Sequence, residues 1–227
     1  KTALIGVWSS AQDFDRRALI RLTYRRYKPH DIDVYFILGQ PETDAHQTLV
    51  GLEMAAHHDI LILNTTENLT EGKTFEFFHT VGTIFEEGDY VFVTKIDSDV
   101  WCELPQFAAR LQALIRQGQS TGTYFGRAIH ETFMAGMAYT LSWDLVRWVA
   151  TDPYPASHRE GFEDQVVGDW LHRSGSLNHF VSEDQAIYDS PDYLVEGGWA
   201  RNYTDGTLIV HQLKQNEWFL RTAKHFL

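Results

Sequence analysis

The sequence is poor in cysteine, in positive charge and in long hydrophobic runs. Cys102 is the only cysteine among its 227 residues, so no disulfide can form within the chain, which favours an intracellular protein. The chain has 19 basic and 31 acidic residues and a formal net charge of −12. This excess of negative charge argues against a nucleic-acid backbone or an anionic membrane surface as the main partner. The sequence contains neither a signal-peptide pattern nor an apolar run long enough to span a bilayer.

Three N-glycosylation sequons point the other way, to the secretory pathway. They lie at Asn64–Thr66, Asn68–Thr70 and Asn202–Thr204. The first residues, Thr2–Trp8, already have the pattern of a buried strand, and natural chains rarely begin so abruptly. We therefore expect an N-terminal region to precede them. Cysteine content and sequons together leave the compartment open.

The composition and the order of apolar segments predict one globular α/β domain over residues 1–227. The chain is 44% hydrophobic and 14% aromatic, enough for one substantial core, and no linker divides it. Alternation of strands with helices is typical of βαβ units and of a central, mostly parallel, twisted sheet flanked by helices. The predicted strands are Thr2–Trp8, Asp33–Gly39, Asp59–Leu63 and Tyr90–Ile96, and the helices between them run from Asp13 or Asp15 to about Tyr27, up to about His57, and from Thr70 to before Gly88.

The second part of the chain has a less regular pattern. Met134–Leu141 is small and apolar, and its pattern predicts no particular element. The other predicted elements are a helix over Leu104–Gln119, a short strand over Thr123–Gly126, a helix capped by Ser142 and ended by Pro153, a helix starting in Gly161–Gly168, a strand over Thr207–His211 and a helix over Asn216–Phe226.

Two carboxylates, Asp97 and Asp99, follow the buried strand Tyr90–Ile96. Ligands of open α/β sheets bind outside the carboxyl ends of the strands, and alternate residues of an extended segment point the same way. The pair can therefore converge on Mg²⁺ or Mn²⁺ that carries a phosphorylated substrate. The alternative is an acidic turn that only ends a strand.

A cluster of positive charge lies early in the chain, in and just after the first predicted helix. Ser9 and Ser10 end the strand before it, and this combination can form an anion site. The alternative is an ordinary solvated basic helix, which is what such a pattern forms in most proteins. The basic residues are Arg16, Arg17, Arg21, Arg25, Arg26 and Lys28.

Glu163, Asp164 and His211 are further candidates, each with a structural alternative. Two acids at a helix start are often only capping groups. A histidine at the end of a strand is more often structural than a ligand.

Several blocks, in order and spacing, resemble glycosyltransferase family 31, the inverting β-1,3-galactosyl- and N-acetylglucosaminyltransferases and their Fringe relatives. Lys95–Val100 stands where that family usually has Lys-x-Asp-Asp-Asp-Val. The other matching blocks are Phe14–Tyr24, Phe36–Gly39, Glu53 with His58–Leu61, Asn68–Thr74, Gly136–Ser142 and Glu163–Gly168, which together cover nearly the whole chain.

The resemblance implies a GT-A-type nucleotide-sugar-binding fold, with donor and metal in the N-terminal half and acceptor in the C-terminal half. It implies inverting, metal-dependent transfer of a hexose, of the galactose type, from a UDP-sugar to a glycan hydroxyl, with Mn²⁺ as the preferred ion. In that family the last aspartate of the acidic motif and a histidine from a late strand hold the metal, which implies Asp99 and His211 here. The resemblance further implies that the nucleotide-sugar is bound by Ser9, Ser10, Arg16, Lys73, Asp97 and Ser98, with Asp97 near the donor ribose or sugar. Asp164 would be the general base, and Glu163 would orient or contact the acceptor.

Departures from the family pattern concern the donor sugar and acceptor more than the reaction class. Ser98 interrupts the triple aspartate, Ala138 replaces a glycine, and the usual cysteines are missing. The chain resembles divergent fungal members more than the animal enzymes. The resemblance also implies a Golgi-lumen enzyme whose N-terminal anchor, now removed, crosses the membrane once. Two other classes stay open: an inactive carbohydrate-binding pseudoenzyme, and a metal-dependent phosphatase or phosphotransferase.

Overall fold

A seven-stranded sheet forms the centre of the protein in a computed structural model, which describes residues 1–24 and 27–227. Its strand order is β3-β2-β1-β4-β7-β6-β8. The bounds are β1 Ala3–Trp8, β2 Ile32–Gln40, β3 Ile60–Thr66, β4 Phe92–Ile96, β6 Thr123–Ile129, β7 Phe133–Ser142 and β8 His179–Ser182.

The first four strands are parallel, as the alternation of strands and helices predicts. Strand β1 pairs with β2 on one side and with β4 on the other, and β2 pairs with β3. Strand β7 is antiparallel to both β4 and β6, while β8 is parallel to β6. A second, three-stranded sheet joins β5 (Trp101–Cys102), β10 (Ile209–His211) and β9 (Ile187–Asp189).

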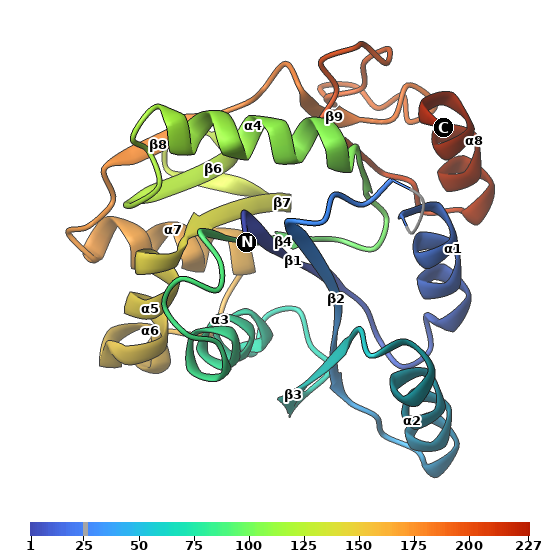
Figure 1. The fold of residues 1–227 in the computed structure, drawn as a ribbon, viewed down its shortest axis with the longest axis horizontal. Coiled ribbons are helices and arrows are strands. Elements are labelled where there is room, and N and C mark those ends of the chain that lie inside the picture. The colour runs from blue at the N-terminus through green and yellow to red at the C-terminus, as the bar shows by residue number, and fades with distance from the viewer. Residues whose placement is uncertain (25–26) are drawn as a thin grey trace.

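Helices cover both faces of the large sheet (Figure 1). Helices α1, α2, α4 and α8 enclose one hydrophobic cluster, which contains Ile5 and Phe107. Helices α3, α5 and α7 enclose the other, which contains Leu4 and Phe78. Neighbouring residues of β1 thus enter opposite clusters, because side chains alternate along a strand. The bounds are α1 Phe14–Tyr24, α2 Asp44–His57, α3 Lys73–Ile84, α4 Leu104–Arg116, α5 Trp143–Thr151, α6 Pro153–Ser157, α7 Glu163–Arg173 and α8 Asn216–Phe226.

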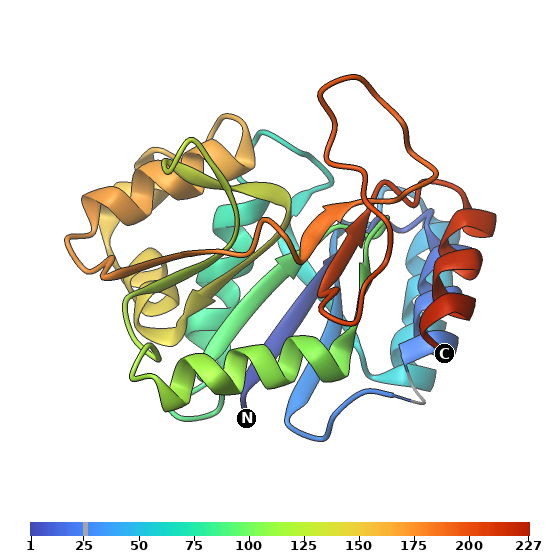
Figure 2. The same ribbon diagram turned by 90° about the horizontal axis from the view of Figure 1, so that it is seen from above.

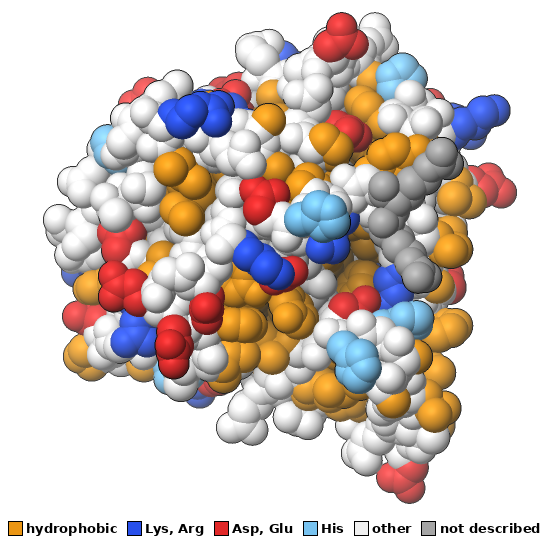
Figure 3. All heavy atoms as spheres, viewed as in Figure 1, with side chains coloured by type: hydrophobic (Ala, Val, Ile, Leu, Met, Phe, Trp, Pro, Cys, Tyr) orange, Lys and Arg blue, Asp and Glu red, His pale blue; other side chains and the backbone are white. Residues whose placement is uncertain are grey.

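The strand order reverses between β1 and β4, and an open sheet of this kind binds ligands at the carboxyl ends of such strands. Val7 pairs with Ile96, so the residues after Trp8 lie beside those after Ile96. In Figure 2 the strands run upward from the N-terminus to their carboxyl ends near the middle of the picture, and the connection between β9 and β10 rises above them. Figure 3 shows the face of the molecule that is seen in Figure 1, where acidic and basic side chains are interspersed with hydrophobic ones.

The predicted end of the first helix, at about Tyr27, stays a prediction, because α1 is described as far as Tyr24 and Arg25 and Arg26 lie outside the described residues. The predicted start of the third helix was wrong. Helix α3 begins at Lys73 and not at Thr70, because Gly72 before it has a left-handed φ of 95°.

Two predictions in the second part also need correction. Ser142 stands at the N-cap of α5, but its hydroxyl accepts a hydrogen bond from the Thr123 N–H at 2.9 Å and caps nothing. Met134–Leu141, for which no element was predicted, lies within β7, between β4 and β6 in the sheet. Among the helices of the described residues, none has both the length and the apolar character needed to span a bilayer.

Candidate active site

Asp97, Asp99 and His211 converge just beyond the carboxyl end of β4. One ligand atom of each lies within 4.8 Å of the others. The backbone holds the loop that carries them: the Val100 N–H donates to the Asp97 carbonyl at 3.3 Å, and the Leu213 N–H donates to the Asp99 carbonyl at 2.9 Å. The structure therefore brings together the two predicted carboxylates and the predicted histidine from opposite ends of the chain.

These three side chains have the chemistry of a divalent-cation site. Two carboxylates and one imidazole suit Mn²⁺, and carboxylates with few protein ligands suit Mg²⁺. All three are half-buried, so a cation held there would remain open to oxygen atoms of a substrate.

Asp189, which was not among the site residues predicted from the sequence, fixes the orientation of His211. Its Oδ1 lies 2.8 Å from His211 Nδ1, whereas Nε2 of the same ring lies 3.6 Å from Asp99 Oδ1. Burial alone would raise the pKa of Asp189, but its hydrogen bond with His211 holds this pKa below the ordinary value. Asp189 is therefore an ionised acceptor behind the ring.

Arg16 joins the loop that carries Asp99 to the segment after His211. Its guanidinium donates to the carbonyls of Leu213 at 2.9 Å and Lys214 at 3.1 Å, and approaches the Ser98 carbonyl at 3.5 Å. The side chain is buried and lies over the Phe219 ring. Arg16 thus lies beside the loop that carries Asp97 and Asp99, which is where a residue that contacts the nucleotide is expected.

Ser9, Ser10 and Lys73 gather at the carboxyl end of β1. The Lys73 ammonium donates to the Ser9 carbonyl at 3.0 Å and to Glu67, and burial lowers the pKa of Lys73. The Ser10 N–H and hydroxyl donate to Asp13 at 2.8 and 2.9 Å. These groups already have protein partners, and their predicted contact with a nucleotide stays a prediction.

The interpretation of the first helix as a solvated basic surface is wrong for Arg17 and Arg21. Arg17 is fully buried and binds both carboxylate oxygens of Glu53, at 3.0 and 2.5 Å. Arg21 bridges Glu53 at 2.6 Å and Asp59 at 2.8 Å. These two arginines hold α1 to α2 and to the start of β3. Arg16 is therefore the arginine of this helix that lies nearest to Asp97 and Asp99.

Glu163, in the first turn of α7, has every carboxylate oxygen engaged. Oε1 accepts from Lys95 at 2.7 Å, and Oε2 accepts from the hydroxyls of Thr74 at 3.0 Å and Tyr139 at 2.8 Å. Glu163 therefore faces the sheet, and the alternative that it only caps its helix is wrong. Its position suits a residue that orders the site.

Asp164 differs from its neighbour. Its Oδ1 accepts from the Gln165 N–H at 2.8 Å, and in the described part of the chain no side chain donates to it. Burial, followed by the charge of Glu163, raises the pKa of Asp164. A half-buried carboxylate with a raised pKa and no side-chain donor has the properties of a general base.

Lys95 connects the two halves of this site, a role that the sequence did not reveal. Its ammonium donates to Asp97 at 2.7 Å, to the Gly136 carbonyl at 2.5 Å and to Glu163 at 2.7 Å. Burial alone would lower the pKa of Lys95, but the carboxylates of Asp97 and Glu163 raise it, so the group stays charged. A lysine inside an otherwise apolar strand was the signal available in the sequence.

Two glycines let α7 approach β7 closely. A Cβ at Gly136 would lie 2.8 Å from Glu163 Oε1 and 3.6 Å from Asp164 Oδ2. A Cβ at Gly168 would lie 2.6 Å from Phe133 Cβ. The two predicted motifs that contain these glycines, Gly136–Ser142 and Glu163–Gly168, therefore lie on elements that pack against each other.

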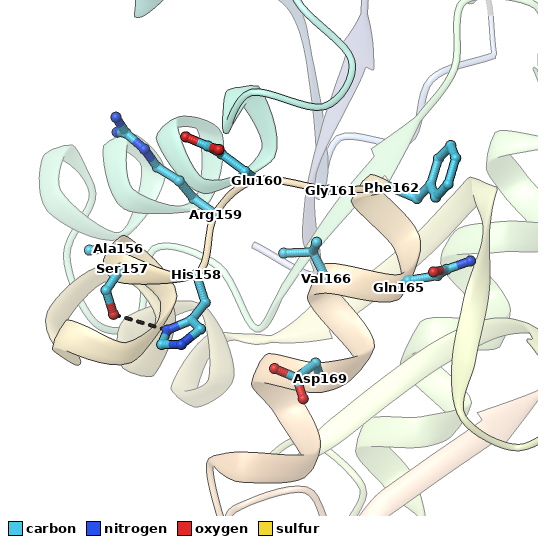
Figure 4. Close-up of a pocket in the computed structure, with 10 residues that line it drawn as sticks. All are labelled: Ala156, Ser157, His158, Arg159, Glu160, Gly161, Phe162, Gln165, Val166 and Asp169. Carbon is cyan, nitrogen blue, oxygen red and sulfur yellow. Dashed lines mark hydrogen bonds between the residues drawn. The ribbon is translucent and has the colours of Figure 1, made fainter.

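A separate hollow of about 650 Å³ lies on the outer side of α7. Figure 4 shows it between α6 and α7, with His158 on one side and Val166 and Asp169 on the other. Within the described residues, none of the predicted site residues lines it. The chemistry described above is therefore outside this hollow, on the side of α7 that faces the sheet.

Comparison with known proteins gives consistent relatives. A family model described as galactosyltransferase matches residues 15–131. The β-1,3-galactosyltransferase pvg3 of Schizosaccharomyces pombe is 22% identical, over 97% of this chain and 75% of the yeast protein.

Solved structures are similar in fold at low identity. An active-site mutant of LgtC has a TM-score of 0.54 at 9% identity and covers 98% of this chain and 93% of its own. The mannosyltransferase PcManGT of Pyrobaculum calidifontis, in complex with GDP-Man and Mn²⁺, has a TM-score of 0.56 at 13% identity, over 98% of this chain and 60% of its own. TarS of S. aureus has a TM-score of 0.55 at 12% identity, over 100% of this chain and 39% of its own.

Proposed function

This chain belongs to the galactosyltransferase family and is a glycosyltransferase of GT-A fold, and from that premise we propose that it transfers a hexose, of the galactose type, from a UDP-sugar to a glycan hydroxyl. The reaction is metal-dependent and inverts the anomeric carbon, so that an α-linked donor gives a β-linked product. The donor binds to the N-terminal half of the chain and the acceptor to the C-terminal half, while the metal lies at Asp99 of the N-terminal half and is completed by His211 of the C-terminal half.

The observation that carries this proposal is the convergence of Asp97, Asp99 and His211 at the switch point of the sheet. In the proposed site Asp99 and His211 hold Mn²⁺. When bound, this cation neutralises the diphosphate of the leaving group. Asp97, already held by Lys95, contacts the donor ribose or sugar.

The nucleotide binds beside the carboxyl end of β1. Ser9, Ser10, Arg16, Lys73 and Ser98 are the proposed contacts. The burial of Arg16 and Lys73 supports this role, because two cations kept in a partly dry site interact strongly with an anionic ligand.

Asp164 takes the proton of the acceptor hydroxyl as that oxygen attacks the anomeric carbon from the face opposite the departing UDP. The raised pKa of Asp164 and its lack of a side-chain donor among the described residues support this role. Glu163 orders the acceptor side through its bonds to Lys95 and Tyr139. The presence of a candidate base, Asp164, beside the anchored carboxylate of Glu163 favours an enzyme over an inactive carbohydrate-binding domain.

The test is a panel of UDP-sugars with Mn²⁺, followed by UDP release with and without added glycosides. We expect one donor to be preferred, release to rise with a suitable glycoside, and the product linkage to be β by NMR. Excess EDTA and Asp99→Ala should each abolish turnover. Full turnover in either case would contradict the metal-dependent reaction, and phosphate release without sugar transfer would favour a phosphatase.

A further inference from the structure

We propose that Asp189 is a positioning residue that fixes the tautomer of His211, so that the Nε2 lone pair of the imidazole faces Asp99 and the cation. The inference rests on the metal site of the proposed function and adds a residue that acts through His211. It explains why a buried carboxylate lies behind the ring, on the side away from Asp97 and Asp99.

The first argument is the hydrogen bond itself. Strands β9 and β10 are parallel, and Asp189 is paired in register with His211. Asp189 Oδ1 lies 2.8 Å from Nδ1, and an ionised carboxylate can only accept. Nδ1 must therefore carry the proton. In the neutral ring, Nε2 is then left with its lone pair, and this atom faces Asp99 Oδ1 at 3.6 Å.

The second argument is that Asp189 cannot turn away from this position. The side chain is buried, with 5% of the residue exposed. Its other oxygen accepts from the Trp199 N–H at 3.2 Å, and its carbonyl accepts from the Arg201 N–H at 3.2 Å. The Ser190 N–H donates to the His211 carbonyl at 2.9 Å and closes the backbone on the other side. The carboxylate is thus fixed before any cation binds.

The third argument is the division of roles among the acids. Asp97 and Asp99 share a possible cation position with His211, whereas Asp189 binds the nitrogen on the other side of the ring. A carboxylate in this place orients a metal-binding imidazole and increases its basicity, and loss of such a partner typically costs about 10- to 100-fold in metal affinity.

The test compares Asp189→Asn with wild type in two measurements. Asparagine keeps the shape, but its amide can donate to Nδ1, which would move the proton to Nε2 and block cation binding. In ¹⁵N-histidine NMR we expect the Nδ1–H tautomer of His211 in wild type and a shift toward Nε2–H in the variant. We expect Mn²⁺ affinity, measured with UDP by electron paramagnetic resonance, to fall by about 10- to 100-fold.

Asp192→Asn is the matched control. Asp192 lies three positions further along the chain, pairs with Arg221 at 2.8 Å and is largely exposed, so its replacement should change neither measurement. The wild-type tautomer also tests the inference if Asp189→Asn does not fold.

The possible outcomes separate this inference from the proposed reaction. An unchanged Mn²⁺ affinity in Asp189→Asn, or an Nε2–H tautomer in wild type, would overturn the role of Asp189 alone. No Mn²⁺ binding by wild type in the presence of UDP would overturn the metal site and the role of Asp189 together. Loss of Mn²⁺ affinity in the variant, in an enzyme that transfers no sugar, would support Asp189 and contradict only the proposed reaction.

Discussion

Lys95 Nζ lies 2.7 Å from the Glu163 carboxylate, across 68 positions of the sequence. The same ammonium binds Asp97, so the acid pair that follows β4 and the acid pair that begins α7 share one cation. This bridge holds the proposed donor side and the proposed acceptor side of the site in a fixed relation.

Replacing Lys95 with methionine should destabilise the fold by about 3–5 kcal/mol, because the largely buried Glu163 carboxylate would lose its counter-ion. The free energy of unfolding in urea measures this change. Lys1→Met is the control: it removes an exposed pair with Asp33 and should cost less than about 1 kcal/mol. Glu163→Gln added to Lys95→Met should recover part of the loss, and wild-type stability in Lys95→Met would contradict the bridge.

Asp164→Asn should keep the fold and the UDP affinity while losing transfer by about 10²- to 10⁴-fold, because the amide cannot take the proton of the acceptor. Single-turnover rates together with UDP binding by calorimetry measure both effects. Asp169→Asn is the control, since this exposed residue of the same helix pairs with Arg173. If the Asp164 variant lost UDP binding as well, the residue would have a donor or structural role; if it kept transfer, Glu163 would be the next candidate.

The acid side of the pH profile should report the raised pKa of Asp164. The base works only when deprotonated, and burial keeps its proton on to a higher pH than the ordinary value of 3.8. Activity should therefore fall as the pH drops, with an apparent pKa above that value in kcat/KM measured from about pH 4 to about pH 8. The residual activity of Asp164→Asn should lack this limb; an identical limb in the variant would assign it to another group.

Gly136→Ala should reduce transfer by about 10- to 100-fold, because the new Cβ would lie 2.8 Å from Glu163 Oε1 and displace the carboxylate from Lys95. Steady-state kinetics and the free energy of unfolding should be measured together. Gly51→Ala in α2 is the control, since nothing lies within 4 Å of its Cβ, and it should stabilise the helix by up to about 1 kcal/mol. An unchanged kcat in Gly136→Ala would show that this close approach is not needed.

Replacing Asn68 should destabilise the protein by about 1 kcal/mol, unlike the asparagines of the other two sequons. Asn68 donates to the Thr66 carbonyl and accepts from the Glu71 N–H, both at 2.9 Å, and so shapes the start of α3. Unfolding of bacterially produced Asn68→Gln measures the loss without glycans. Asn64→Gln and Asn202→Gln change exposed side chains and should stay within about 0.5 kcal/mol of wild type.

The parallel half of the fold could be predicted because its strands are short apolar runs separated by amphipathic helices. The antiparallel half was harder, since its strands carry little such signal. Strand β7 contains small residues and Gly136, which a helix or a loop could contain equally well. Strands β5 and β9 have two and three residues, and only their pairing with β10 makes them strands.

The residues of the candidate site also fall into two groups, those that could be predicted from the sequence and those that could not. Asp97, Asp99 and His211 could be named because each stands at the end of an apolar run, and the structure brings them together. Lys95 and Asp189 act through contacts with residues distant in the sequence, so no local pattern reveals their roles. Arg16 and Arg17 are adjacent arginines that a sequence pattern does not distinguish. Only the fold shows that Arg17 pairs with Glu53, whereas Arg16 donates to the Leu213 carbonyl beside the candidate site.

Strand β10, which lies beside the Asp99 loop in the fold, is among the last elements to leave the ribosome. Strands β1 to β8 can associate before residues 209–213 emerge, but His211 and the Leu213 N–H that holds the Asp99 carbonyl come afterwards. We therefore expect the cation site to be the last part to mature during synthesis. A nascent chain stalled within the connection between β9 and β10 would contain a folded sheet that cannot yet retain a nucleotide-sugar.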